Sequence, residues 1–562
     1  MMTRELIPLE VFLKADNHLK RNIDEVKEIL DKKQFMPRLN SDIIQITFPV
    51  DWEGLSRIED SNWRMQLQGW AMFFPMLYYF DKHLDKNKVI DFFIKIVEDW
   101  YMKYGHESEY IITNRNPVSY AWYDMSVGFR AIVLSFFINR ISYFKINIPS
   151  KSKEILLNVI NQTINNLSWD KAFSFNNHGI FQLHGLMLLI HALGKENYKD
   201  EKQYVLSQMK KLIFSQFDKN GMHTEHSPHY HFYAINMFEK IIFSNNWYEK
   251  DDNKEDNEML DRLKKAIYMK KWLVDPYSRP PCIGDSVLTI QNNIDRNNVS
   301  YDANFCYFSD DKKFIYSNFN DSGYSVFKSH WNNDKPVFLF FMGMYNSKTH
   351  KHRDCQSFEW MDYGKKILCD GGKYGYKKDK YRKYFLSYKA HNTIDIENFD
   401  ILKFEPYSSC IKFSKYIQNI FYLHSSLHFP SVVFDRKIYL KPSKYLIVRD
   451  FVSFSEERLC TQWFHLDKDF YLVENRVNYS VFNNGNFRLF VYHQKDINKQ
   501  IYYGDEDNLS GIISEKDLVT EKTYSLGFSF TAKTKEIVTI FTFIESDYYK
   551  LLDEVDRFHE LV

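Results

Sequence analysis

The spacing of apolar residues changes near Tyr301, and this change constrains the fold more than any single motif does. From about residue 5 to residue 300, apolar residues recur at a spacing near 3.6, as in helices that bury one face. Beyond residue 301, short segments alternate apolar and polar residues and end at Gly, Asn or Asp, as antiparallel strands do. We therefore predict an α+β multidomain protein, with an α-helical domain over residues 1–310 and an antiparallel β-sandwich domain over residues 311–562.

Several segments carry these two patterns clearly. Long helices joined by short polar loops are typical of a helical bundle, a toroid or a solenoid. The predicted helices include Trp63–Phe80, Val89–Tyr104, Met125–Phe144, Lys153–Leu167 and Ile180–Gly194. The predicted strands lie within residues 324–331, 336–344, 357–364, 366–372, 392–398, 431–440, 445–454 and 538–545.

Composition excludes some classes of protein. With 562 residues the chain is too long for one ordinary core, so we expect two large domains. Its 74 Lys and Arg residues balance 73 Asp and Glu residues, which argues against a general nucleic-acid binder. An anionic ligand would need a local basic patch, for which Lys151–Glu154 and Lys377–Lys383 are candidates. The six cysteines form no CxxC pair, so no zinc finger or disulfide framework is predicted.

The start of the chain shows no signal peptide, and no stretch of about 18 uninterrupted apolar residues predicts a membrane span. We expect a cytoplasmic protein without a membrane partner, or a periplasmic or secreted one if a leader was removed.

One stretch of the β half concentrates His350, His352, Asp354, Asp370 and His391. Alternate residues of a strand point to the same face, and imidazole with carboxylate is the usual ligand set for zinc and non-haem iron. The stretch therefore predicts a metal site or a proton-transfer site. The alternative is that these residues decorate a solvated strand edge.

Two polar groups stand at predicted helix starts in the other half. Asn176, Asn177 and His178 precede an apolar helix, where Asn serves either as a cap or as a donor that faces a cleft. The segment after the turn DKNG is rich in histidine, and Pro228 suits a first helical turn that would set Tyr230 near the helix start. Its polar residues are His223, Glu225, His226, His229, Tyr230 and His231. The alternative is that each histidine is an ordinary surface residue.

Taken in order, the motifs NNHG, SPHYH, THKHRDCQSFEW, LCDGGKYGY and SYKAHNTIDI resemble the heparinase II/III-like family of polysaccharide lyases. The segment Phe319–Trp331 is also similar to the start of that family's β domain, and the resemblance extends from about Trp63 onward. It implies an (α/α) toroid followed by an antiparallel β-sandwich. It also implies β-elimination on a uronic-acid-containing polysaccharide, which is glycosaminoglycan-like, alginate-like or a bacterial capsule, to give a 4,5-unsaturated uronate.

The resemblance assigns roles to single residues. It implies that Asn177 and His178 bind and neutralise the uronate carboxylate, because a proton alpha to a carboxylate leaves only when that charge is neutralised. It makes Tyr230 the proton donor, places His350 at the active site, and leaves the base open between Tyr230 itself and His178.

We also expect Glu225 and His229 to bind substrate, and either His226 or His229 to be the partner of Tyr230. A tyrosine has an ordinary pKa near 10, so work as a base requires imidazole or cationic neighbours that lower the pKa. The candidates for that effect are His229, His231 and His350.

The resemblance further implies one zinc ion, or another divalent metal, bound by His352, Asp370 and His391. We expect its role to be structural, holding the strands that present His350, because an elimination consumes no water.

Two other readings stay open. His352, Asp354 and His391 also fit the facial triad of a non-haem iron oxygenase, which would leave NNHG and SPHYH without a task. A non-catalytic glycan-binding or polysaccharide-assembly protein would bind an anionic polysaccharide without an unsaturated product. A homodimer is expected as an option, and the polymer, the uronate epimer and the mode of cleavage do not follow from the sequence.

Overall fold

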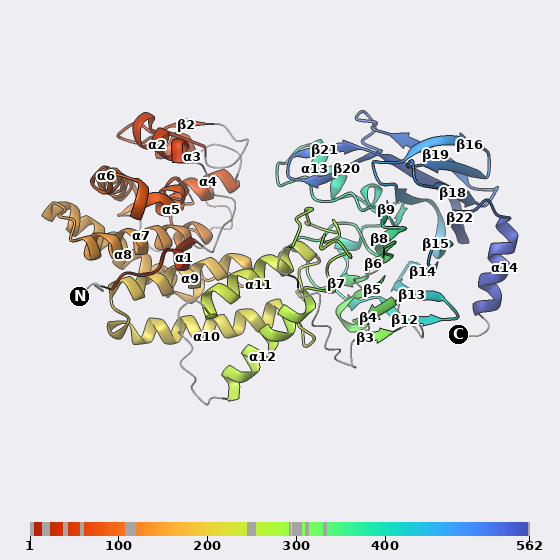
Figure 1. Ribbon diagram of the computed structural model, residues 1–562, viewed down its shortest axis with the longest axis horizontal. Helices are drawn as coiled ribbons and strands as arrows, with labels where there is room; N and C mark the ends of the chain where they lie inside the picture. Colours follow the sequence, from red (N-terminus) through yellow and green to blue (C-terminus); the bar gives the residue numbers. More distant parts are fainter. Residues whose placement is uncertain are drawn as a thin grey trace. The chain divides into compact units, whose positions relative to one another are not determined.

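The computed structural model divides the chain into two compact units (Figure 1). The helical unit comprises Met1–Gln216 and Tyr233–Leu263, and the sandwich unit comprises Phe217–Phe232 and Lys264–Val562. The sequence analysis placed a single boundary near residue 310. In the structure, residues 217–232 and 264–310 belong to the same compact unit as the strands. The described residues are 5–13, 23–36, 43–56, 61–106, 120–243, 254–291, 294, 306–308, 314–317, 319–329 and 334–559.

The helical unit is built from α-helices, most of which bury one apolar face (Figure 1). Helix α6 illustrates why such a sequence forms a helix. The side chain of Asp85 caps its start by accepting from the N–H groups of Asn87 and Lys88, and the apolar residues that follow face the core at helical spacing. The helices are α1 (Leu9–Leu13), α2 (Ile23–Lys32), α3 (Trp52–Ser56), α4 (Ser61–Gln68), α5 (Phe74–His83), α6 (Lys86–Tyr104), α7 (Met125–Phe144), α8 (Ser150–Leu167), α9 (Asn177–Leu193) and α10 (Lys199–Gln216). Helices α11 (Pro228–Phe243) and α12 (Lys254–Met269) contribute residues to both units.

Helix α7 is apolar on all sides because α4, α5, α8 and α9 pack against it. It is long and apolar enough to cross a membrane, but 83% of its apolar stretch is buried inside the protein. Glycines let α7 and α9 approach closely: a Cβ atom on Gly128 would lie 2.6 Å from the Phe181 carbonyl oxygen, and one on Gly185 would lie 2.5 Å from that of Gly128. This contact fixes the start of α9 beside the start of α7.

The sandwich unit contains two large antiparallel sheets. Its six-stranded sheet has the order β3 (Cys306–Phe308), β4 (Phe314–Ser317), β5 (Tyr324–Ser329), β6 (Phe338–Met342), β8 (Ser357–Asp362) and β9 (Lys365–Leu368). Its larger sheet has the order β12 (Ile411–Ile417), β13 (Ile420–Phe429), β14 (Val432–Lys441), β15 (Tyr445–His465), β22 (Tyr524–Thr542), β18 (Arg488–His493), β17 (Tyr479–Asn483) and β16 (Tyr471–Asn475). Strand β10 (Ile394–Ile396) pairs with β15, and β19 (Asn498–Tyr503) pairs with β22.

The two sheets enclose the main core, in which Phe341 and Trp360 of the smaller sheet share one apolar cluster with Leu446 of the larger one. The smaller sheet is covered on its other face as well, where Trp272 and Phe340 belong to a second buried apolar cluster. Coverage of both faces explains why β5, β6 and β8 are buried at every position, whereas β14 alternates buried and half-buried residues.

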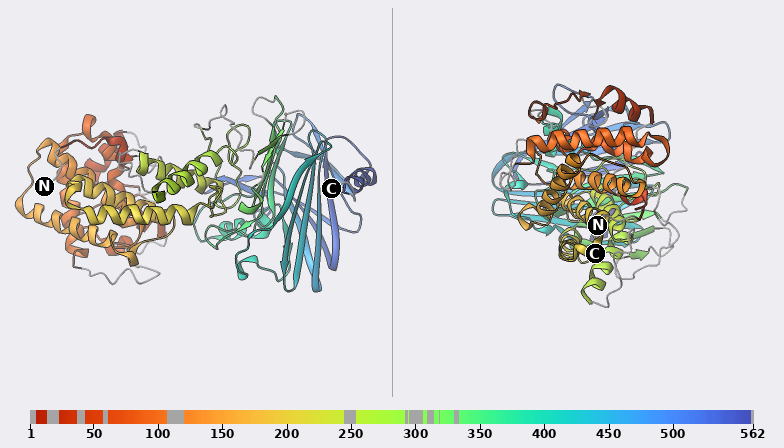
Figure 2. Two further views of the ribbon diagram at one scale, coloured as in Figure 1. Left: turned by 90° about the horizontal axis from the view of Figure 1, so that it is seen from below. Right: turned by 90° about the vertical axis from the view of Figure 1, so that its left-hand side faces the viewer.

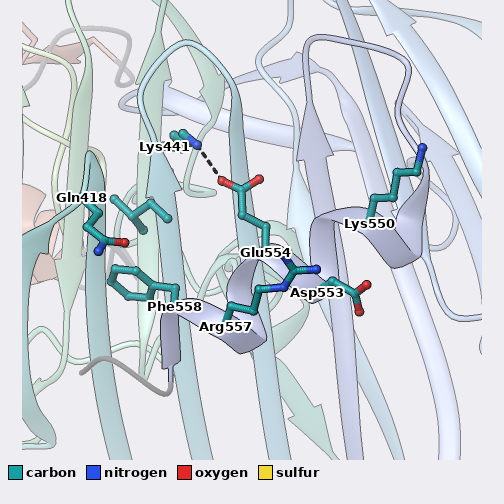
Figure 3. Close-up of a pocket in the computed structure, with 8 residues that line it drawn as sticks. Gln418, Lys441, Lys550, Asp553, Glu554, Arg557 and Phe558 are labelled. Carbon is teal, nitrogen blue, oxygen red and sulfur yellow. Dashed lines mark hydrogen bonds and ion pairs between the residues drawn. The ribbon is translucent and has the colours of Figure 1, made fainter.

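Helix α14 (Tyr548–His559) lies on the outer face of the larger sheet, where Val555 and Phe558 pack against its strands (Figure 2). A cavity of about 430 Å³ opens beside this helix, and an ion pair between Lys441 and Glu554 crosses it (Figure 3). The cavity is lined by Gln418, Ile420, Lys441, Lys550, Asp553, Glu554, Arg557 and Phe558. None of these lining residues is a tyrosine or a histidine, so the predicted acid–base chemistry lies elsewhere.

The predicted fold class is confirmed: an N-terminal (α/α) toroid precedes an antiparallel β-sandwich. One predicted helix is wrong in detail, because Trp63–Phe80 is two helices. Trp70 takes a left-handed backbone conformation with φ of 57° between α4 and α5, which interrupts the helical hydrogen bonds.

Candidate active site

The start of helix α11 presents the predicted tyrosine. Pro228 occupies the first helical position, and the Oγ atom of Ser227 accepts from the N–H of Tyr230 at 3.3 Å, which caps the helix. Ser286 fixes this turn from another loop, since its Oγ atom lies 2.9 Å from that of Ser227 and accepts from the N–H of His229 at 3.3 Å. The backbone of Tyr230 is therefore held from two sides.

The partner of the Tyr230 hydroxyl is another tyrosine. The Oη atoms of Tyr230 and Tyr376 lie 2.5 Å apart, and Tyr376 donates to Oδ2 of Asp285 at 3.1 Å. This tyrosine partner was not named in the sequence analysis, and the choice between His226 and His229 as a further partner stays a prediction. Two cations contact the ring of Tyr376: Lys373 Nζ is 4.6 Å and the Arg382 guanidinium 5.1 Å from the ring centre.

Asp285 is fully buried and joins three functional side chains. Besides Tyr376, its Oδ1 atom contacts His352 Nε2 at 2.8 Å and Arg382 Nη1 at 2.8 Å. Burial alone would raise the pKa of this carboxyl group, but the hydrogen bond from His352 and the charge of Arg382 outweigh burial and hold the pKa far below its ordinary value. Asp285 is therefore a carboxylate at neutral pH.

The expectation that neighbours lower the pKa of Tyr230 is wrong. Burial, followed by the negative charge of Asp285, raises the pKa of Tyr230 well above its ordinary value. His231 supplies no positive charge, because it is buried with its pKa far below the usual range, and its Nε2 atom bonds the Ala266 carbonyl oxygen at 3.0 Å. Tyr230 is thus a protonated phenol at neutral pH.

His350 stacks on Tyr230, with ring centres 4.0 Å apart and planes inclined by only 10°. Its Nδ1 atom lies 2.9 Å from Oε2 of Glu225, whose side chain is almost fully buried. In a neutral ring the Nδ1–H donates to this carboxylate, which leaves Nε2 as a proton acceptor. The predicted residues Tyr230, His350 and Glu225 therefore come together, although Glu225 orients His350 where substrate binding was predicted. That predicted role stays untested.

Two other histidines of the SPHYH region, His226 and His229, differ in what they contact. His226 accepts from the N–H of Asn346 at 2.8 Å and contacts the Thr349 carbonyl oxygen at 3.2 Å, so it fixes the loop that carries His350. His229 is half-buried and meets the Tyr230 ring edge-on.

Asn176, Asn177 and His178 belong to the helical unit. Asn176 is the cap of α9, since its side chain accepts from the N–H of His178 at 2.8 Å, and Asn177 is mostly buried at the first helical position. His178 Nδ1 lies 2.7 Å from Oδ2 of Asp124. Asp124 has φ of 53°, a costly conformation for a residue with a side chain, which is typical of functional sites.

The predicted metal ligands lie behind this site. His352 and His391 have ring centres 5.3 Å apart. Among the described residues, one buried nitrogen of each ring has no hydrogen-bond partner: Nδ1 of His352 and Nε2 of His391. Two free imidazole nitrogens are donors that zinc accepts. Asp370 is occupied by His391 Nδ1 at 2.9 Å and by Ser357 at 2.7 Å. Over the described residues, no group of three or more His, Cys, Asp or Glu side chains is placed to hold a metal ion.

Sequence reasoning missed Asp285, Tyr376 and Arg382. Asp285 lies in the loop sequence PPCIGDS, Tyr376 ends the motif LCDGGKYGY, and Arg382 lies in the candidate basic patch Lys377–Lys383, but none of these patterns indicates a partner. Asp285 and Tyr376 are 91 residues apart, and Tyr230 and Tyr376 are 146 residues apart, so spacing along the chain gives no hint of these contacts.

With this geometry in view, comparison with known sequences decides the family. Residues 13–316 match the model of the heparinase II/III N-terminus, and residues 312–541 match the model named heparinase II/III-like, C-terminal. The chain belongs to the heparinase II/III family. Helix α14 lies beyond the matched residues.

Individual members of the family are distant from this chain. A heparin-sulfate lyase of Bacteroides stercoris is 25% identical over 385 residues, which cover 62% of this chain and only 56% of that protein. Among solved structures, heparinase III has a TM-score of 0.74 at 15% identity and covers 97% of this chain and 88% of its own. A mutant of heparan sulfate lyase HepC from Pedobacter heparinus has a TM-score of 0.64 at 18% identity, with 95% and 86% covered. These structures share the fold.

Proposed function

We propose that this member of the heparinase II/III family is a polysaccharide lyase that cleaves a glycosaminoglycan-like polysaccharide by β-elimination. The observation that carries the proposal is the pairing of a buried phenol, Tyr230, with a stacked imidazole, His350, which Glu225 orients. An elimination needs one group that takes the C5 proton and one that gives a proton to the departing O4. This pair supplies both.

Tyr230 is the proton donor in this proposal, because its raised pKa keeps it a phenol at neutral pH. The base is His350, whose Nε2 atom takes the C5 proton. The electrons of the C5–H bond form the C4–C5 double bond, the C4–O4 bond breaks, and O4 receives the proton of Tyr230. The product is a 4,5-unsaturated uronate.

Neutralisation of the substrate carboxylate falls to Asn177 and His178. Among the described residues, the Asn177 amide has no hydrogen-bond partner, so it is free to bind an oxygen of the carboxylate. His178 is 39% exposed, and the carboxylate of Asp124 contacts its Nδ1 atom at 2.7 Å, which fixes the orientation of the ring. Donors of this kind lower the barrier to loss of the proton at C5.

The stacking of acid and base favours one class of uronate. Because the rings of Tyr230 and His350 lie in parallel contact, they meet the sugar from the same side. Such an arrangement suits uronates in which the C5 proton and O4 leave from the same face, as in glucuronate, over those in which they leave from opposite faces, as in iduronate. A basic segment supports a strongly anionic polymer: Lys377, Lys378 and Lys383 are exposed next to Tyr376.

We further propose that His352 and His391, with Asp370, hold one zinc ion. The two free imidazole nitrogens support this role, and Asp370 would have to turn from Ser357 to join them. When bound, the ion would supply rigidity to the segments that carry His350. Metal analysis of the purified protein tests the site: about one zinc per chain is expected, and no retention after His391→Ala.

The deciding experiment follows the ultraviolet absorbance of the unsaturated uronate over a panel of heparan sulfate, hyaluronan, chondroitin, alginate and capsular polysaccharides. A rise with a glucuronate-containing polymer is expected, and Tyr230→Phe should lower the rate by about 10²- to 10⁴-fold. Tyr374→Phe is the matched control, because its hydroxyl contacts Asp379 rather than Tyr230. Full activity in Tyr230→Phe would refute the proposed role, and binding without product would favour a non-catalytic glycan-binding protein.

A further inference from the structure

The loop that carries Asp285 has no role in the function proposed so far, yet specific contacts fix its backbone on both sides of Asp285. Gly284 has φ of 61°, and a Cβ atom there would lie 2.4 Å from the His226 carbonyl oxygen, so only glycine fits. On the other side of Asp285, Ser286 bonds Ser227 and His229 at the start of α11. The loop is thus fixed directly to the turn that presents Tyr230.

The hydrogen bonds of Asp285 determine where two protons lie. A carboxylate only accepts, so the O–H of Tyr376 must point at Asp285 Oδ2. Tyr376 then has no proton left for its 2.5 Å contact with Tyr230, and Tyr230 must be the donor of that bond. One buried carboxylate therefore sets the direction of both hydroxyl groups.

The same carboxylate orients an imidazole and a guanidinium. Its Oδ1 atom contacts His352 Nε2, which assigns the proton to that nitrogen and leaves the buried Nδ1 without a partner. Arg382 reaches the same oxygen and also donates to the Lys373 carbonyl oxygen at 2.9 Å, which ties down the segment around Tyr376. Asp285 therefore contacts Tyr376, His352 and Arg382 at once.

We propose that Asp285 is a positioning residue, which holds Tyr230 as an oriented proton donor through Tyr376 and holds His352 in a single tautomer. The inference rests on the function proposed above, in which Tyr230 protonates O4. When Tyr230 has given up its proton, the Tyr376 O–H turns from Asp285 to the Tyr230 oxygen and stabilises the phenolate. Asp285 itself touches no substrate.

A substrate-free measurement tests the hydrogen-bonded chain. 3-Fluorotyrosine placed at position 230 of the full chain gives one fluorine resonance that reports on the hydrogen bond of that phenol. Asp285→Asn and Tyr376→Phe should each shift this resonance, because each breaks the chain. Asp275→Asn should not, although Asp275 is a buried carboxylate of the same loop, because it bonds Arg279 and the N–H of Tyr277.

Kinetics on the polymer found in the absorbance panel provide the second test. Asp285→Asn and Tyr376→Phe should each lower kcat by about 10- to 100-fold with KM little changed. The double variant should lose no more than either single one, since both changes remove the same chain. Additive losses, or a rise in KM alone, would overturn the inference.

The two tests separate the possible failures. A fluorine shift in a protein that makes no unsaturated product would keep the positioning role and refute the proposed function. An unchanged resonance in both variants would refute the positioning role whatever the activity. Tyr376→Phe removes one oxygen atom from a partly exposed ring, so it decides the matter even if Asp285→Asn fails to fold.

Discussion

At the scale of single residues, the histidines separate into two groups by their partners. His178 and His350 each place Nδ1 against a carboxylate, at 2.7 Å from Asp124 and 2.9 Å from Glu225, and each keeps some exposure to solvent. His223 and His226 are buried and bond the backbone. A carboxylate within 3 Å of Nδ1 together with partial exposure distinguishes His178 and His350 from the buried histidines His223 and His226.

The two carboxylate partners should differ in what they control. If His350 is the base, Glu225→Gln should lower kcat by about 10- to 100-fold and leave KM nearly constant, because the amide no longer fixes the imidazole tautomer. If His178 binds the substrate carboxylate, Asp124→Asn should raise KM more than it lowers kcat. Steady-state kinetics of both variants measure the split, with Glu554→Gln on α14 as the control. The reverse pattern would exchange the two roles.

The sequence predicted the site residues that stand in short local motifs, but not those whose role depends on contacts with distant segments. Tyr230 and His350 stand in short motifs whose residue types already indicate acid–base chemistry, and the structure brings them into contact. Asp285 and Tyr376 acquire their meaning only from contacts between distant segments. The sequence around a buried loop carboxylate such as Asp285 shows no hydrophobic periodicity and no known motif, so it gives no signal that the carboxylate is part of a site.

At the scale of elements, hydrophobic periodicity predicted most helices and strands because it reports directly on burial. Helices α6 to α9 and strands β5, β6, β8 and β14 coincide with predicted segments, whereas β15 continues to His465, beyond the predicted end at residue 454. The end of helix α4 at Gln68 was not predicted. The apolar pattern continues through Gly69 and Trp70, but the helical backbone conformation stops there. There, tertiary packing overrides local propensity: a Cβ atom on Gly69 would lie 2.8 Å from the Phe129 side chain.

One cross-strand pair should dominate the stability of the larger sheet. Arg436 of β14 and Asp450 of β15 are register partners, fully buried, and joined by two hydrogen bonds of 2.7 Å. Arg436→Met leaves the carboxylate buried without its partner, so the free energy of unfolding should fall by about 3–5 kcal/mol. Chemical denaturation measures the loss.

Controls from the same strands make this prediction specific. Arg449→Met removes a cation whose partner Asp556 is half exposed, and it should cost no more than about 1 kcal/mol. The double change Arg436→Met with Asp450→Leu removes both buried charges and should regain most of the stability. A loss in Arg436→Met no larger than that in Arg449→Met would show that the pair is not the determinant.

At the scale of the whole molecule, buried neutral histidines make folding depend on pH. Burial lowers the pKa of His223, His465 and His493 to about 4 each, whereas a histidine in the unfolded chain has a pKa near 6.5. The unfolded state therefore binds more protons below pH 6.5. Stability from these groups is complete above that pH and is lost as the pH falls toward 4.

Acid unfolding should accordingly respond to a single buried histidine. In His223→Gln the group that must stay neutral is gone, while the amide oxygen can still accept from the N–H of Glu225, which contacts His223 Nδ1 at 3.3 Å. A pKa depressed from 6.5 to about 4 corresponds to roughly 3 kcal/mol, so the variant should lose up to that much less stability than the wild type between pH 6.5 and pH 4. Urea denaturation followed by tryptophan fluorescence at a series of pH values measures both slopes. His428→Gln, at a side chain that is 65% exposed, should leave the wild-type slope unchanged. If His223→Gln and His428→Gln gave the same slope, acid sensitivity would have to come from groups other than the buried histidine.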